Sequence, residues 1–211
     1  IKKIEIKNYE YNNVEVEGNF KNQIFSGFLG VKEENISFDI DGNINYSKDI
    51  PELNFVSTIA DAKLAKLNFI DSDAKLKTRF STQLKVNLLG ESIDDISGEI
   101  EFVNSQYNDK LDSILVENIL ISSNFQEDKR RLEVTSDLLD ASVEGRFKFA
   151  EITKYVQQFF SRYIPSQIDE FHTITDLSDD INFNVELHNS ELLSKVLFGG
   201  IKMSDHTTIT G

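Results

Sequence analysis

The stretch Ser37-Phe38-Asp39-Ile40-Asp41-Gly42-Asn43-Ile44-Asn45-Tyr46 alternates apolar and polar residues, with a glycine on the apolar parity. Successive side chains on a β-strand point to opposite faces, so the four apolar residues share one face with Gly42. The other face carries only polar side chains. The pattern therefore predicts a strand with one apolar and one solvated face. A glycine inside such a strand needs a reason, because it contributes no side chain to packing.

The same pattern, apolar-x-Gly-x-apolar, recurs at residues 16–20, 40–44, 96–100 and 143–147. Its central residues are Gly18, Gly42, Gly98 and Gly145. Each falls on the apolar face of its predicted strand, where a missing side chain allows the sheet to bend sharply toward that face. The uneven spacing excludes a solenoid with a fixed coil length and favours a long sheet of similar strands.

The amino-acid composition argues against some classes of function. The chain has 211 residues, with 22 Lys and Arg against 36 Asp and Glu, and these charges are dispersed. Such a balance argues against binding nucleic acid through its phosphates. No apolar run approaches the roughly 18 residues of a membrane-spanning helix. Because the chain starts without a methionine and ends within a predicted strand, we expect it to be a section of a longer protein.

Alternation predicts strands along most of the chain, and the longest regular run is residues 76–88. Residues 115–125 are apolar on both parities, so their inner face cannot be assigned. Residues 151–164 carry one apolar stripe at helical spacing and are followed by Pro165, which predicts an amphipathic helix. A short second helix is predicted at 191–198. The expected fold is all-β: one long, curled antiparallel sheet over residues 1–211, with two helices and no independent second domain.

Residues suited to catalysis are not grouped in the sequence. His172, His188 and His206 lie apart without the spacing of metal ligands, and the chain has no cysteine, so no metal site is predicted. It contains no nucleophile-elbow serine and no glycine-rich loop that opens a helix to hold phosphate. We therefore expect a protein that is not an enzyme and uses no cofactor.

An apolar sheet face must be covered, and two solutions are open. The strands can form a two-layer sandwich, or the sheet can curl at its glycines into a trough whose lining is filled by ligand. In the trough, acyl chains would lie along the apolar strand residues. The predicted lining residues are Phe38, Ile40, Ile44, Tyr46, Phe80, Leu84, Val86, Leu88, Ile100, Phe102, Val134, Val143, Phe147 and Phe149.

Two segments carry a resemblance to a known family. Residues 38–69, with the Asp-Gly pattern and Ile50-Pro51, resemble the Asp-Gly repeats of the TamB family (translocation and assembly module subunits) in its Bacteroidota-type versions. Residues 132–147, followed by the predicted helix ending in Tyr163-Ile164-Pro165-Ser166, are similar to the same family. The resemblance covers most of residues 14–166.

The resemblance implies an AsmA-like, bridge-type lipid transfer protein. Such proteins are anchored in the inner membrane and cross the periplasm as a curled sheet that shields phospholipid acyl chains on the way to the outer membrane. The implied partners are phospholipids and a partner in outer-membrane β-barrel assembly, with membrane contact through other parts of the parent chain. The alternatives are a scaffold that offers strand edges to other β-proteins, and an extracellular β-sandwich binding module. The predicted helix 151–164 could be a plug, a lid or a wall of the groove.

Overall fold

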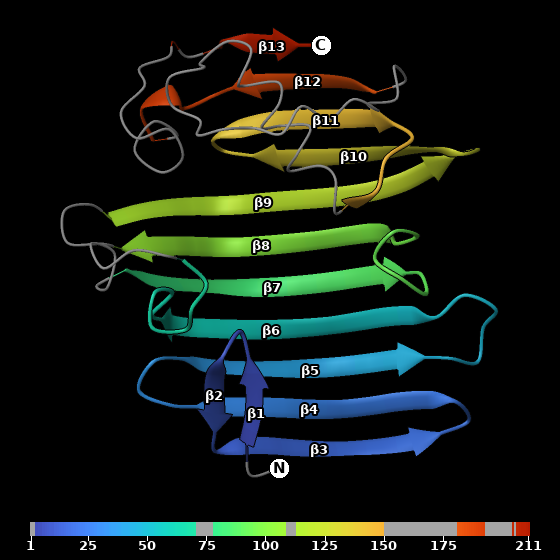
Figure 1. Ribbon diagram of the computed structural model, residues 1–211, viewed down its shortest axis with the longest axis vertical. Helices are drawn as coiled ribbons and strands as arrows, with labels where there is room; N and C mark the ends of the chain where they lie inside the picture. The colour runs from blue at the N-terminus through green and yellow to red at the C-terminus, as the bar shows by residue number, and fades with distance from the viewer. Residues whose placement is uncertain (1–2, 71–77, 109–112, 150–180, 193–203, 205) are drawn as a thin grey trace.

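The computed structural model describes residues 3–70, 78–108, 113–149, 181–192, 204 and 206–211, and these contain thirteen β-strands (Figure 1). The strands are β1 Lys3–Ile6, β2 Tyr9–Asn12, β3 Val14–Lys21, β4 Ile24–Lys32, β5 Ser37–Asn45, β6 Glu52–Ala62, β7 Arg79–Leu89, β8 Ser97–Asn108, β9 Ser113–Gln126, β10 Lys129–Ser136, β11 Leu139–Gly145, β12 Asn182–Leu187 and β13 Thr208–Thr210.

Strands β3 to β13 form one antiparallel sheet of eleven strands, in which each strand pairs with the next one along the chain (Figure 1). Tight turns make this order possible: Asn22 and Gln23, which join β3 to β4, both have positive φ, as a two-residue type I′ hairpin turn requires. Strands β3 and β13 are the two edges of the sheet and are not paired with each other. The predicted all-β, antiparallel fold class is confirmed.

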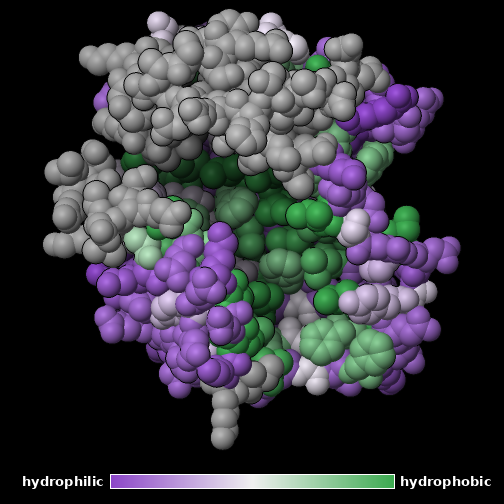
Figure 2. Space-filling view, viewed as in Figure 1, coloured by the Kyte–Doolittle hydropathy of each residue, from purple (hydrophilic) through white to green (hydrophobic). Residues whose placement is uncertain are grey.

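The register lines the apolar residues up in rows across the sheet. In one row, Gly18, Gly27 and Gly42 lie opposite one another and are followed by Phe55 of β6 and Val86 of β7. Directly paired residues share a face, so the apolar residues of these rows lie on one side of the sheet. We call this side the inner face. In Figure 2 it forms a hydrophobic hollow between hydrophilic rims.

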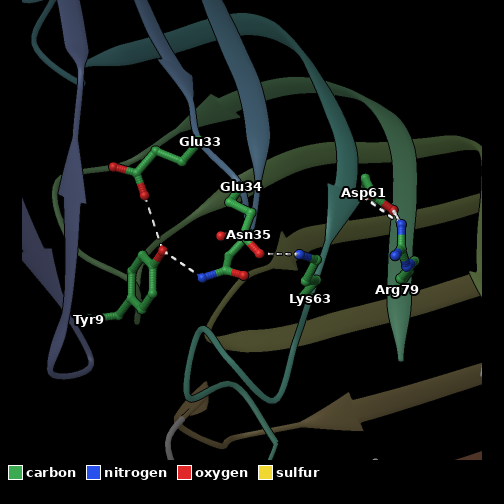
Figure 3. Close-up of polar contacts among 7 residues, drawn as sticks. All are labelled: Tyr9, Glu33, Glu34, Asn35, Asp61, Lys63 and Arg79. Atoms are coloured by element: carbon green, nitrogen blue, oxygen red, sulfur yellow. Dashed lines mark hydrogen bonds and ion pairs between the residues drawn. The ribbon is translucent and has the colours of Figure 1, made fainter. Parts of the chain in front are cut away.

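The buried core lies at one end of these strands, where the β1–β2 hairpin crosses the inner face over the first strands of the sheet (Figure 1). The core consists of Tyr11, Val14, Val31, Ile36, Ala62 and Leu67. The Tyr9 hydroxyl donates a hydrogen bond to the Glu33 carboxylate at 3.0 Å and accepts one from the Asn35 amide at 3.1 Å (Figure 3). The hairpin is thereby fixed to the β4–β5 connection.

Two bulges bend the sheet near this same end. The register shifts by one residue between Ile59 and Ala62 of β6, where Asp61 has a φ of 54° and forms an ion pair with Arg79 (Figure 3). A second shift lies opposite Thr82, where Asn104 of β8 has a φ of 52°. Extra residues of this kind bend a strand and increase its twist.

The second irregularity also explains the two apolar parities of β9. Val116 pairs with Ser105 and faces inward, while Ile119 pairs with Phe102 and faces inward too. The inward parity of β9 therefore changes between Val116 and Ile119. Since each half of the strand alternates on its own parity, the sequence alone could not assign one inner face.

Four predictions need correction or lie wholly or partly beyond the described residues. Strand β11 ends at Gly145, so the prediction that strand alternation continues through Phe147 and Phe149 is wrong. The predicted strand 37–46 ends at Asn45, so Tyr46 lies one residue beyond β5, with 50% of the residue exposed. The predicted helix 151–164 lies outside the described residues, as do residues 193–198 of the predicted helix 191–198, whereas residues 190–192 are helical. Within the described ranges, the structure contains no helix with the length and hydrophobicity needed to cross a membrane.

Candidate functional site: the inner face of the sheet

The register brings most of the predicted lining residues together in continuous rows. Ile40 and Leu84 flank Ser57 of β6, and Leu84 pairs with Phe102. A parallel row contains Ile44 and Leu88 on either side of Leu53. A third contains Val86, Ile100 and Val134, with Ile121 of β9 between the last two. Val143 pairs with Leu132, and Phe38 and Phe80 lie against the core beneath the β1–β2 hairpin.

These rows are accessible rather than sealed. Val86 is buried, but Ile40, Leu84, Phe102 and Val134 remain partly exposed. Figure 2 shows the corresponding hydrophobic surface at the bottom of the hollow. Apolar side chains that stay partly exposed over many adjacent strands form a patch that soluble proteins usually reserve for binding.

Sequence reasoning left several lining residues out. The register adds Leu29, Leu53, Phe55, Ile119, Ile121 and Val185 to the inner face. Leu53 and Phe55 could have been included from their own alternation. The β9 residues could not, because their parity depends on the irregularity at Asn104.

The opposite face of the sheet, called the polar face, is mainly polar, with exceptions such as Val56, and carries exposed ion pairs. Lys85 of β7 lies 2.9 Å from Glu101 of β8. Arg131 contacts Glu133 at 2.8 Å and Glu144 at 3.1 Å. Exposed pairs of this type contribute only about 0–1 kcal/mol each, so their main effect is to keep this face in water.

Two of the predicted bend glycines lie where neighbouring backbones approach closely. A Cβ atom added to Gly42 would lie 2.2 Å from the Asn54 carbonyl oxygen. One added to Gly98 would lie 2.1 Å from the Asn87 carbonyl oxygen, and Gly98 has a φ of +124°, which side chains rarely allow. Gly18 lies in the same row as Gly42, whereas Gly145 closes β11.

Arg130 is the one charged residue on the inner face of the eleven strands that the structure describes. It alternates with Leu132 and Val134 on β10 and pairs with Phe125 on one side and Gly145 on the other. The two predicted lining residues beyond β11, Phe147 and Phe149, lie against its guanidinium group. Sequence reasoning missed this residue, since Lys129 and Arg131 beside it make the segment resemble a solvated turn.

A second group of polar side chains lies on the polar face. Ligand-type atoms of Glu186, His188 and His206 lie within 4.8 Å of one another, and a carboxylate oxygen of Asp140 lies 3.2 Å from His188 Nε2. The prediction that the histidines stay apart is wrong for these two, because the β12–β13 pairing brings them together; His172 lies outside the described residues. Two imidazoles and a carboxylate are a ligand set that zinc accepts. The group is separate from the apolar lining.

Comparisons of the chain with protein-family models, with curated proteins and with solved structures give no match. The site must therefore be interpreted from its own geometry.

Proposed function

We propose that this chain is a section of a non-enzymatic lipid conduit, whose inner face shields acyl chains from water. The observation that carries the proposal is the apolar lining, which continues across all eleven strands while many of its side chains stay partly exposed. The proposed setting is the periplasm, with phospholipid moving between the inner and outer membranes. That setting follows from the resemblance of residues 38–69 and 132–147 to the TamB family.

The chemistry of the lining suits hydrocarbon. Its side chains are mainly branched aliphatic residues and Phe, which offer dispersion contacts but no hydrogen bonds. Removing an acyl chain from water is favourable by roughly 0.8 kcal/mol per methylene. Such binding is strong in total yet indifferent to where along the groove the chain lies, as transport requires.

A closed sandwich is the main alternative for an apolar sheet face. Among the described residues, the only other sheet is the β1–β2 hairpin, which packs against the core at one end of the first strands. The row through Ile100, Ile121 and Val134 has no second sheet over it in the described part of the chain. This arrangement favours a trough over a sandwich.

The decisive experiment compares two arginine substitutions on β5. Ile40→Arg places a charge on the inner face, and Asn43→Arg places the same charge on the polar face of the same strand. We expect Ile40→Arg to weaken binding of a fluorescent acyl lipid at least tenfold, and Asn43→Arg to leave it unchanged. Far-UV circular dichroism should report a folded sheet for both variants.

A closed sandwich predicts a different result for the same variants. In a sandwich core, Ile40→Arg would bury an unpaired charge and unfold the protein. The wild-type chain would then carry no lipid through purification, as judged by mass spectrometry of an organic extract. A lipid-free, unfolding-sensitive protein would therefore refute the proposal.

The scaffold function is a second candidate, because β3 and β13 each pair with a neighbour on one side only. An edge strand can accept an added strand through its backbone. Isotope-edited infrared spectroscopy with a labelled β-strand peptide would detect such pairing. Pairing that persists in the Ile40→Arg variant would assign the edges a function independent of the groove.

A further inference from the structure

Arg130 is the one charged residue on the inner face of the described strands. Its guanidinium is almost completely buried, with 1% of the residue exposed. Phe125 and Gly145 flank it on the neighbouring strands, and Gly145 offers no side chain that would compete for the space. The sheet therefore contains one positive charge at a fixed point of an apolar surface.

Three aromatic rings surround this charge. The central carbon of the guanidinium lies 4.2 Å from the ring centre of Phe149, 4.7 Å from that of Phe125 and 5.8 Å from that of Phe147. The segment carrying Phe147 and Phe149 follows β11 and returns toward the β7–β8 connection (Figure 1), where the Phe149 amide donates to the Asp94 carboxylate at 3.0 Å. Ring faces attract a cation but accept no strong hydrogen bond.

The hydrogen bonds of Arg130 are incomplete. Nη2 donates to the backbone carbonyl of Asp94, whereas Nε and Nη1 are buried without any hydrogen-bond partner. Burial lowers the pKa of the Arg130 guanidinium, and the nearby charges of Asp94 and Asp95 oppose that shift. An arginine remains protonated at neutral pH in either case, so its free N–H groups are donors only.

The nearby carboxylates do not complete the site. The Asp94 carboxylate accepts the Phe149 amide, and the Asp95 carboxylate accepts the amides of Glu91 and Ser92 within its own turn. If Arg130 only joined the β7–β8 connection to β10, the hydrogen bond from Nη2 to the Asp94 carbonyl would suffice. That function would leave Nε and Nη1 buried without a partner. Buried charges in proteins are normally paired, so the unfilled donors point to a ligand.

We propose that Arg130 binds the anionic group of an acyl lipid, a phosphate or carboxylate, whose chain lies along the inner face. The inference rests on the proposed conduit and adds a headgroup preference to it. Arginine suits this task because its planar N–H groups match the oxygens of phosphate and carboxylate. Leu132 and Val134, next on the same face of β10, would contact the first part of the chain.

Phe125 provides the entrance. It is 42% exposed at the end of β9, so its ring can turn into solvent without opening the buried core. A headgroup arriving at this edge would replace the ring face with oxygen atoms that accept the free hydrogen bonds.

The experiment uses all 211 residues and two lipids with identical acyl chains, phosphatidic acid and diacylglycerol, which differ only in the phosphate. Each displaces a neutral fluorescent diacylglycerol from the wild type, from Arg130→Met and from Arg131→Met. Arg131 is the matched control because it lies on the polar face of the same strand. We expect the wild type and Arg131→Met to prefer phosphatidic acid about tenfold to hundredfold, the ratio typical of a charge-assisted hydrogen bond. Arg130→Met should bind both lipids alike.

The outcomes separate this inference from the conduit itself. Equal wild-type affinity for the two lipids would overturn the headgroup site and leave the conduit intact, whereas binding of neither lipid would overturn the conduit. If millimolar inorganic phosphate displaced phosphatidic acid, the site would be one for free anions and the inference would be wrong. The ratio of the wild-type affinities for phosphatidic acid and diacylglycerol tests the headgroup site even if Arg130→Met fails to fold.

Discussion

Gly42→Ala tests how the central glycines shape the sheet. A Cβ atom at this position would lie 2.2 Å from the Asn54 carbonyl oxygen and 2.4 Å from the Phe55 Cβ, where ordinary contacts begin at 3.4 Å. The backbones of β5 and β6 would have to separate by roughly 1 Å, which strains their pairing at the centre of both strands. These contacts involve backbone, so no side-chain rotation relieves them.

The expected cost follows from two contributions. Overpacking costs typically about 1–3 kcal/mol, and a weakened ladder hydrogen bond adds about 1 kcal/mol. Gly42→Ala should therefore lower the free energy of unfolding by about 2–4 kcal/mol.

Gly30→Ala on β4 is the matched control. Its Cβ would meet only ring atoms of Phe28, at 2.9 Å, and that ring can rotate on the polar face. Both substitutions restrict the unfolded chain equally. The difference between them therefore isolates the close backbone approach.

Urea unfolding followed by far-UV circular dichroism measures the difference, and suits a chain without tryptophan. The control should stay within about 1 kcal/mol of the wild type. Equal stability of the two alanine variants would refute the close approach of β5 and β6 at Gly42.

Three further predictions concern stability. Gly98→Ala should destabilise the chain by at least as much as Gly42→Ala, since its φ of +124° adds strain to a 2.1 Å contact; a neutral effect in the same urea titration would contradict this. Tyr11→Ala should cost about 3 kcal/mol because the ring is 4% exposed within the core, whereas Phe20→Ala, at 64% exposure, should be nearly neutral by thermal unfolding. Burial also raises the pKa of Tyr11, so the folded state holds this proton more tightly than the unfolded state. The stabilisation is complete below the ordinary tyrosine pKa of about 10 and is lost as the pH rises further, which urea titrations at increasing pH should detect. Tyr11→Phe should reduce this loss without removing it, because burial also raises the pKa of Tyr9.

The alternation of apolar and polar residues in the sequence predicts most of the fold. A period of two fixes which side chains share a face, so the sequence alone groups Ile40 and Ile44 correctly. The order of the strands follows from short turns such as Asn22-Gln23, which leave consecutive strands side by side. What alternation could not supply is register, because a shift of two residues preserves every face.

The incorrect predictions arise because alternation does not determine which residues of neighbouring strands pair. The inward parity of β9 changes opposite Asn104, an irregularity in backbone conformation that hydrophobic periodicity does not record. His188 and His206 are far apart along the chain and meet only through the β12–β13 pairing. Arg130 is flanked by two basic residues, and its burial depends on Phe125 and Gly145 lying opposite it.

The glycines of the apolar-x-Gly-x-apolar pattern thus have more than one structural function. Gly18 and Gly42 share one row, Gly98 lies in the next row, and Gly145 lies in the row after that, opposite Arg130. The glycines therefore shift step by step toward the end of the strands where the guanidinium lies. At Gly42 and Gly98 the missing side chain admits a neighbouring backbone, whereas Gly145 carries no side chain on the face that Arg130 occupies. One sequence pattern accordingly serves both the close packing of the strands and the placement of Arg130, the one charged residue on the inner face of the described strands.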